Sequence, residues 1–301
     1  MGNMITAEFR KILTTRLWWA LLIPAFIMAL GVAWIWSAIT TGISNDLVDE
    51  ELIQQFDVPV DEISWSVIAL VRGMNLASIF PMVFGALGLA SELHRKTITT
   101  SFLTASSRPG LLAAKSITYA LWGLIYGLII AAGVSLGTLI GSDRNYLPDA
   151  KQWFLILLAG LFMCVLWTIF ALGVGALIGS PVGTLVILLI YTLIVGPLGE
   201  IALFTTTGGS HAPGFMPNGS ANGMTGSTAS VLLFDQIQAL ILDRGGQVVD
   251  DDVREGFQQF ISVVAGAHGA FSLWLSGLIF LAWTGIFYVT GMLRNQARDI
   301  T

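Results

Sequence analysis

Six long apolar stretches divide this chain of 301 residues, and they constrain its fold more than any other feature. A helix that crosses a bilayer needs about 20 consecutive, mostly apolar residues. Only 11% of the residues are charged, against about 25% in a soluble domain. We therefore expect an all-α membrane protein with a single transmembrane domain. Its six spans are predicted at residues 17–39, 65–90, 111–140, 153–178, 184–204 and 271–293.

The second span is the least uniform of the six, because Arg72 and Asn75 interrupt its apolar run. We interpret it as one long helix whose outer end emerges from the bilayer. Pro81 predicts a kink in this helix, since proline cannot donate a backbone hydrogen bond.

The distribution of charge predicts the orientation of the spans. The N-terminal segment, the connection between the second and third spans and the C-terminal tail hold nine of the 14 Lys and Arg residues. The opposite side holds sixteen of the 19 acidic residues. Basic residues mark the cytoplasmic side of a membrane protein. We expect a multi-pass protein of the cell (inner or plasma) membrane with both termini cytoplasmic, and no nucleic-acid partner.

The residue types that carry catalysis are not grouped in this sequence. It has no glycine-lysine loop for phosphate, no zinc-ligand spacing and no recognisable pair of nucleophile and base. The single cysteine, Cys164, lies in an apolar run, and the three histidines are scattered. We expect no catalytic, cofactor-binding or metal site, and no ATPase activity in this chain itself.

Residues 4–16 have the pattern of an amphipathic helix that lies at the cytoplasmic surface of the membrane. Trp18 and Trp19 follow, at the level where aromatic belts contact lipid headgroups. The predicted apolar face holds Ile5, Phe9, Ile12 and Leu13, and the other faces hold Glu8, Arg10 and Lys11.

The cytoplasmic loop 91–110 has the composition of a docking surface, with an apolar patch inside a charged rim. The alternative is an ordinary basic loop that only sets the topology. Glu92 is expected to pair with Arg95 or Lys96, one helical turn further on. The apolar patch consists of Ile98, Phe102 and Leu103, and the rim of Glu92, Arg95, Lys96 and Arg108.

The order of residues from Glu92 to Lys115 resembles that of ABC-2-type transporter permeases. In that family a Glu that ends the second span is followed by a basic residue, a Thr, a Leu-Leu-like step, a Ser-Arg turn and a Lys that opens the third span. Lys96 stands where many members have glycine. The matching residues here are Glu92, Arg95 or Lys96, Thr97, Phe102-Leu103, Ser107-Arg108 and Lys115.

This resemblance implies the membrane subunit of an ATP-driven exporter of drugs, lipids or other hydrophobic or amphiphilic compounds. It implies a second permease subunit, identical or related, and a separate ATPase subunit that binds ATP and Mg and contacts the loop 91–110; membrane lipids surround the spans. The alternative is a non-transporting membrane scaffold or an immunity or resistance protein that acts by binding. An intramembrane enzyme is disfavoured, because the spans lack paired acids.

Two other features complete the expectations. The outer segment 205–270 is predicted to begin with a flexible loop, 205–230, because it is rich in Gly, Ser, Thr and Asn. Short amphipathic helices should follow over 231–243 and from Asp252, which forms a capping-box-like pair with Glu255. The pairs Gly123/Gly127, Gly137/Gly141 and Gly175/Gly179 indicate close helix packing within the chain.

Polar residues near the outer ends of the spans have two interpretations. Arg72, Asn75 and Glu200 either line a translocation path or stand in the headgroup layer.

The orientation leads to a prediction for accessibility. Single cysteines at positions 57, 143 and 250 should react with an impermeant maleimide added outside the cell, because these acidic positions lie in predicted outer loops. Cysteines at positions 96, 180 and 298 should react only after the membrane is permeabilised. Labelling of positions 96 and 250 from the same side would contradict six spans.

Overall fold

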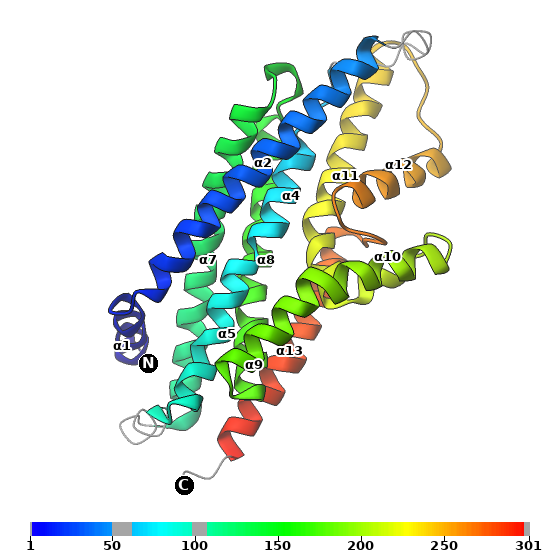
Figure 1. The fold of residues 1–301 in the computed structure, drawn as a ribbon. Helices are drawn as coiled ribbons and strands as arrows, with labels where there is room; N and C mark the ends of the chain where they lie inside the picture. The colour runs from blue at the N-terminus through cyan, green and yellow to red at the C-terminus, as the bar shows by residue number, and fades with distance from the viewer. Residues whose placement is uncertain (1, 50–61, 98–106, 298–301) are drawn as a thin grey trace.

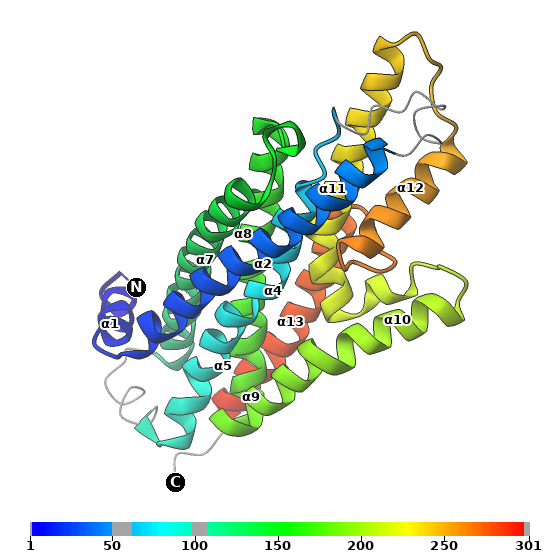
Figure 2. The same ribbon diagram turned by 45° about the horizontal axis from the view of Figure 1, so that its top comes forward.

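The computed structural model describes residues 2–49, 62–97 and 107–297 as an elongated helical bundle, shown in Figures 1 and 2. These residues contain no β-strand. Six helical segments are long and apolar enough to cross a membrane, which confirms the predicted helical fold with six candidate spans. They are Leu17–Asp46, Val67–His94, Arg108–Gly141, Ala150–Ile178, Pro181–Thr206 and Leu273–Asn295.

The N-terminal helix and the C-terminal end of the last helix lie at the same end of the bundle, as six spans would require (Figure 1). We call this the terminal end, and the opposite end the far end. The helices α2 (Leu17–Asp49) and α7 (Arg108–Gly141) contain 33 and 34 residues. At 1.5 Å per residue each is about 50 Å long, well beyond the hydrocarbon thickness of about 30 Å. Each helix is therefore longer than a single span requires.

Glycines let the helices α2, α7 and α8 (Ala150–Ile178) approach closely. A Cβ added at Gly137 would collide with the carbonyl of Leu30, and one at Gly123 would lie 2.7 Å from Thr168 Oγ1. The predicted use of these glycines for packing within the chain is confirmed at both positions. Gly179 serves differently, because it ends α8 in the left-handed region with φ 76°.

The second span consists of α4 (Val67–Ala77) and α5 (Ile79–His94), which follow each other end to end (Figure 1). The interruption falls at Ser78. Pro81 has no N–H to donate to the carbonyl of Ala77, four residues earlier, so the hydrogen-bond ladder is weakened at this point. The kink predicted at Pro81 therefore takes the form of a break between α4 and α5.

The fifth span is also irregular. It runs through α9 (Pro181–Ile190), a π-helical turn (Tyr191–Val195) and α10 (Gly196–Thr206). Beyond this turn, α10 leans away from the bundle (Figures 1 and 2). A π-turn adds a residue to the helical ladder, and such turns are frequent at functional sites.

The segment after α10 corrects the predicted loop over 205–230. A short 3-10 turn (Ala212–Phe215) leads into one long helix, α11 (Pro217–Asp243), which packs against α4, α8 and the last helix, α13 (Leu273–Ala297). Its small residues permit close approach, since a Cβ at Gly223 would lie 2.7 Å from Ser276 Oγ. Its hydroxyls are satisfied locally, as when Ser227 Oγ donates to the Gly223 carbonyl at 2.6 Å.

The helix α12 (Asp251–Val264) follows, close to the predicted start at Asp252. Its N-cap is Asp250, which makes no side-chain capping bond. The expected capping box of Asp252 and Glu255 is therefore wrong, because Asp252 already lies inside the first helical turn. Asp251 and Asp252 in this first turn still interact favourably with the positive end of the helix dipole.

The packing of α2 on α7 can be tested with a matched pair of substitutions. Gly137→Ala should lower the thermal midpoint of the detergent-solubilised protein, because the added methyl displaces backbone at a typical overpacking cost of about 1–3 kcal/mol. Gly31→Ala, on the facing helix with no atom within 4 Å of its added Cβ, is the control and should leave the midpoint equal or higher. Equal midpoints for the two variants would contradict this packing.

Candidate functional site

A cluster of four charged residues, three of them buried, joins three helices at the terminal end. The Lys115 ammonium, on α7, donates to Glu8 Oε2 at 2.6 Å and to Glu92 Oε1 at 2.7 Å. Lys11 donates to the same oxygen of Glu92 at 2.6 Å. The side chain of Lys115 is only 1% exposed, so this cation depends on the two carboxylates for its stability.

The cluster attaches the N-terminal helix α1 (Gly2–Leu13) to α5 and α7. Phe9 of α1 stacks on Trp122 of α7 with ring centroids 5.2 Å apart, next to the ion pairs. The predicted faces of this helix need two corrections: Glu8 is buried, whereas Leu13 is 46% exposed. Glu8 is drawn inward because Lys115 offers it a buried partner.

The predicted partners of Glu92 are also wrong. Arg95 and Lys96 are exposed at the end of α5, while Glu92 turns inward to Lys115 and Lys11. Lys96 has φ 58°, in the left-handed region that favours glycine. This is the position at which many ABC-2-type permeases have glycine. The loop conformation is therefore one that a glycine would adopt with less strain.

Of the remaining residues of the predicted docking loop, the structure describes Arg108 but not the three apolar residues. Arg108 is the first residue of α7, directly after the N-cap Ser107, whose side chain accepts a hydrogen bond from the Gly110 N–H. Ile98, Phe102 and Leu103 lie outside the described residues. Their docking role stays a prediction.

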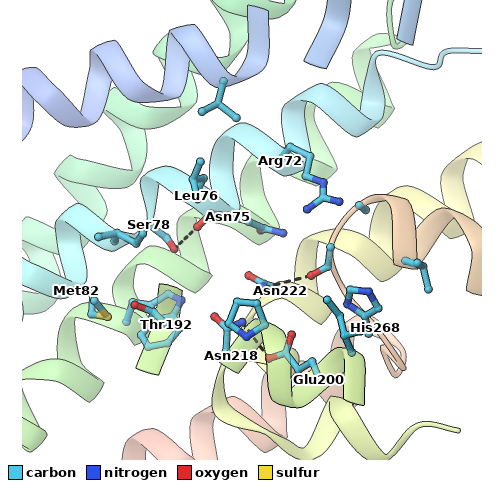
Figure 3. Close-up of a pocket in the computed structure, with 18 of the residues that line it drawn as sticks. Arg72, Asn75, Leu76, Ser78, Met82, Thr192, Glu200, Asn218, Asn222 and His268 are labelled. Carbon is cyan, nitrogen blue, oxygen red and sulfur yellow. Dashed lines mark hydrogen bonds between the residues drawn. The ribbon is translucent and has the colours of Figure 1, made fainter. Parts of the chain in front are cut away.

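A cavity of about 420 Å³ lies between the second and fifth spans and α11, and Figure 3 shows it in close-up. Arg72, Asn75 and Glu200, the three residues predicted for a translocation path, all line it. The volume falls in the range of about 300–1,000 Å³ that is typical of ligand pockets. The tertiary structure thus brings together polar groups that are more than a hundred residues apart in the sequence.

Arg72 is held at one side of the cavity. Its Nε donates to the Val264 carbonyl at 2.7 Å, and its guanidinium lies 4.7 Å from the ring centroid of Trp36. Among the described residues, no carboxylate pairs with Arg72, and its two terminal amino groups make no hydrogen bond. A cation over an aromatic face is stabilised by the ring quadrupole, but it keeps its charge.

Glu200 occupies the other side of the cavity (Figure 3) and is 1% exposed. Its Oε1 accepts a hydrogen bond of 3.0 Å from Asn218 Nδ2, in the first turn of α11. The positive end of this helix dipole favours a carboxylate there. Within the described residues, no basic side chain pairs with Glu200.

Two polar atoms of the cavity lack hydrogen bonds. Asn75 Oδ1 accepts from Thr225 Oγ1 at 2.6 Å, but Asn75 Nδ2 is buried without a partner in the part of the chain that the structure describes. The same holds for His268 Nδ1. Burial, and then the nearby charge of Arg72, lower the pKa of His268 below its ordinary value, so its ring favours the neutral form. Unpaired buried polar atoms are costly, so each of these two atoms needs a partner such as water or a ligand.

The sequence predictions did not include several residues of these sites. The sequence analysis places Glu8 and Lys11 on a face of the N-terminal helix and uses Lys115 only for topology and for the family resemblance. A lysine inside an apolar span is nevertheless a signal for a buried pair. Asn218, Asn222 and His268 were assigned to an outer loop, and no local signal places them beside the second span. The described residues contain no group of His, Cys, Asp and Glu side chains arranged to hold a metal ion.

Compared with models of known protein families the chain matches none, and a search among curated proteins gave no significant match. What the chain does must therefore be inferred from its own residues and geometry.

The buried charge cluster yields a prediction about stability. Lys115→Met should destabilise the protein by about 3–5 kcal/mol, because two buried carboxylates lose their shared cation. Lys11→Met is the matched control. It should cost about 1 kcal/mol or less, because the Lys11 side chain is 45% exposed and surface pairs contribute little. Denaturant unfolding in micelles measures both, and equal losses would contradict the central role of Lys115.

Proposed function

We propose that this chain is the membrane-spanning permease subunit of an ATP-driven exporter of the ABC-2 type. It moves hydrophobic or amphiphilic compounds out of the cell, and a separate ATPase subunit supplies the energy. One observation carries this proposal: ion pairs centred on the buried Lys115 join α1 to the two helices, α5 and α7, that flank the cytoplasmic loop 91–110.

This arrangement suits the transmission of force. An ATPase that presses on the loop would act on the end of α5 and the start of α7 together. Because Lys115 binds carboxylates from α1 and α5 simultaneously, these three elements would move as one unit. Tightly packed, ion-paired elements shift between discrete positions rather than deform continuously.

The same movement would reach the cavity through α5. This helix has 16 residues, about 24 Å at 1.5 Å per residue, and it begins directly after the break at Ser78. Ser78 and Asn75 both line the cavity. A push at the terminal end would therefore change the cavity at the hinge, which is the coupling that an exporter needs.

The partners follow from the proposal. A second permease subunit, identical or related, would complete the transmembrane unit, and ATP and Mg would be bound by the ATPase. This chain would carry the path and the coupling contacts but no catalytic residue.

The first experiment identifies the partner. Affinity purification of the tagged chain in mild detergent, followed by mass spectrometry, should recover a second polypeptide with nucleotide-binding motifs in near-stoichiometric amount. The purified complex should hydrolyse ATP, whereas the chain alone should not. Two results together would favour the binding-only alternative: the chain is recovered without any ATPase, and cells that make the chain but lack the ATPase still resist the toxic compound.

The second experiment tests the loop. Phe102→Ala should weaken co-purification of the ATPase and reduce substrate-stimulated ATP hydrolysis, because truncating an interface anchor costs about 2 kcal/mol or more. Thr99→Ala, in the same loop but outside the apolar patch, is the control and should behave as the unmodified chain. Full stimulation and transport in the Phe102 variant would leave the loop as a simple connection.

A further inference from the structure

The two ionisable side chains at the sides of the cavity, Arg72 and Glu200, do not form an ion pair with each other in the described structure. Figure 3 shows Arg72 and Glu200 at opposite sides, with Asn75 and Asn222 between them. Each has its own support: the Val264 carbonyl and the Trp36 ring for Arg72, and Asn218 for Glu200. If the two residues served only to stabilise the fold, a direct ion pair would be the more economical arrangement, because a charge away from bulk water is costly without a counter-charge.

Between the two charges, Asn222 Nδ2 donates to the Gly266 carbonyl at 3.3 Å, whereas one group of Asn75 is unused. Asn75 Nδ2 is a buried donor with no acceptor among the described residues. A ligand that placed an acceptor oxygen here would satisfy it. The cavity therefore presents, in order, a cation, an unused donor and a carboxyl group, which a cationic group of a ligand would hold in its ionised form. This order is complementary to a molecule with an anionic group, acceptor oxygens and a cationic group.

The walls of the cavity indicate that this molecule has an apolar part. Leu76 and Ile201 line the cavity and are also 40% and 44% exposed at the surface of the bundle. Both belong to candidate spans, so we expect their exposed sides to face lipid. A chain that left the cavity beside them would pass directly into the apolar phase.

We propose that this cavity binds the head of a zwitterionic amphiphile. Its anionic group lies at Arg72, its cationic group at Glu200, and its alkyl or acyl chain passes Leu76 and Ile201 into the bilayer. The inference deepens the proposed export function by naming a substrate class, and it rests on that function only for the claim that the bound molecule is exported.

Direct binding to the purified chain tests the site without any transport. Four soluble probes share the same dihexanoyl tails: a phosphatidylcholine as the zwitterion, a phosphatidylglycerol as the anion, a trimethylammonium-propane as the cation, and the neutral diacylglycerol. Native mass spectrometry from maltoside micelles gives their affinities. We expect the zwitterion to bind about tenfold or more tightly than each of the others.

Charge-neutralising variants assign the two ends. Arg72→Gln and Glu200→Gln should each abolish the preference for the zwitterion. Arg72→Gln should leave binding of the cation unchanged, and Glu200→Gln should leave binding of the anion unchanged. Arg144→Gln and Asp235→Asn, at exposed positions away from the cavity, are the controls and should keep the preference. Size-exclusion profiles and thermal midpoints establish which variants are folded.

Analysis of the lipid that co-purifies with the chain distinguishes two sources of the ligand. If zwitterionic phospholipid co-purifies with the chain and is lost from both variants, the ligand is a lipid of the bilayer. If co-purified lipid is unchanged but the probe preference is lost, it is another amphiphile of the same charge pattern. Both results support the site.

The opposite results would overturn it. These are equal affinity for all four probes, a preference that survives in both folded variants, or equally tight binding of glycerophosphocholine, which has the head without tails. Failure of export in a complex that keeps the preference would instead count against the proposed function alone.

Discussion

The ammonium group of Lys115 is the point on which the terminal end of this bundle depends. It is almost completely buried, and it binds one carboxylate from α1 and one from α5 while it is itself part of α7. Desolvation of a buried ion costs several kcal/mol, which only well-placed partners can offset. A register shift of any of the three helices would leave a buried charge unpaired. The cluster therefore determines how these helices are aligned, whatever its net contribution to stability.

The far half of the bundle is held together differently. There α11 packs through glycine, serine, threonine and alanine, and its hydroxyls bond to its own backbone, so it can lie close to its neighbours without unsatisfied groups. The irregular points of the fold meet where this helix begins: the break at Ser78, the π-turn Tyr191–Val195 and the first turn of α11. Irregular backbone at membrane depth is tolerated where it is buried or lines a cavity, and here it lines the cavity that holds Arg72 and Glu200.

The two sites are connected by α5, whose C-terminal end carries Glu92 and whose N-terminal end follows the break beside the cavity. A rigid element between a charged anchor and a hinge is a simple mechanical link. The exporter that we propose needs such a link, because the energy would enter at the loop 91–110 and the substrate would be bound at the other end of the helix. The absence of an Arg72–Glu200 ion pair in the described structure leaves both charges available to a ligand at that end.

The apolar stretches alone determined that the chain is helical and has six candidate spans, because length and hydropathy are local properties that a bilayer reads directly. They also placed Arg72, Asn75 and Glu200 near the ends of spans. The tertiary structure decided the rest. Glu92 pairs with Lys115 and Lys11 rather than with its neighbours on α5, since burial favours distant partners that the sequence does not bring together. The segment 217–230 forms a helix because close packing, rather than intrinsic propensity, stabilises its small residues, and only the surrounding helices supply that packing.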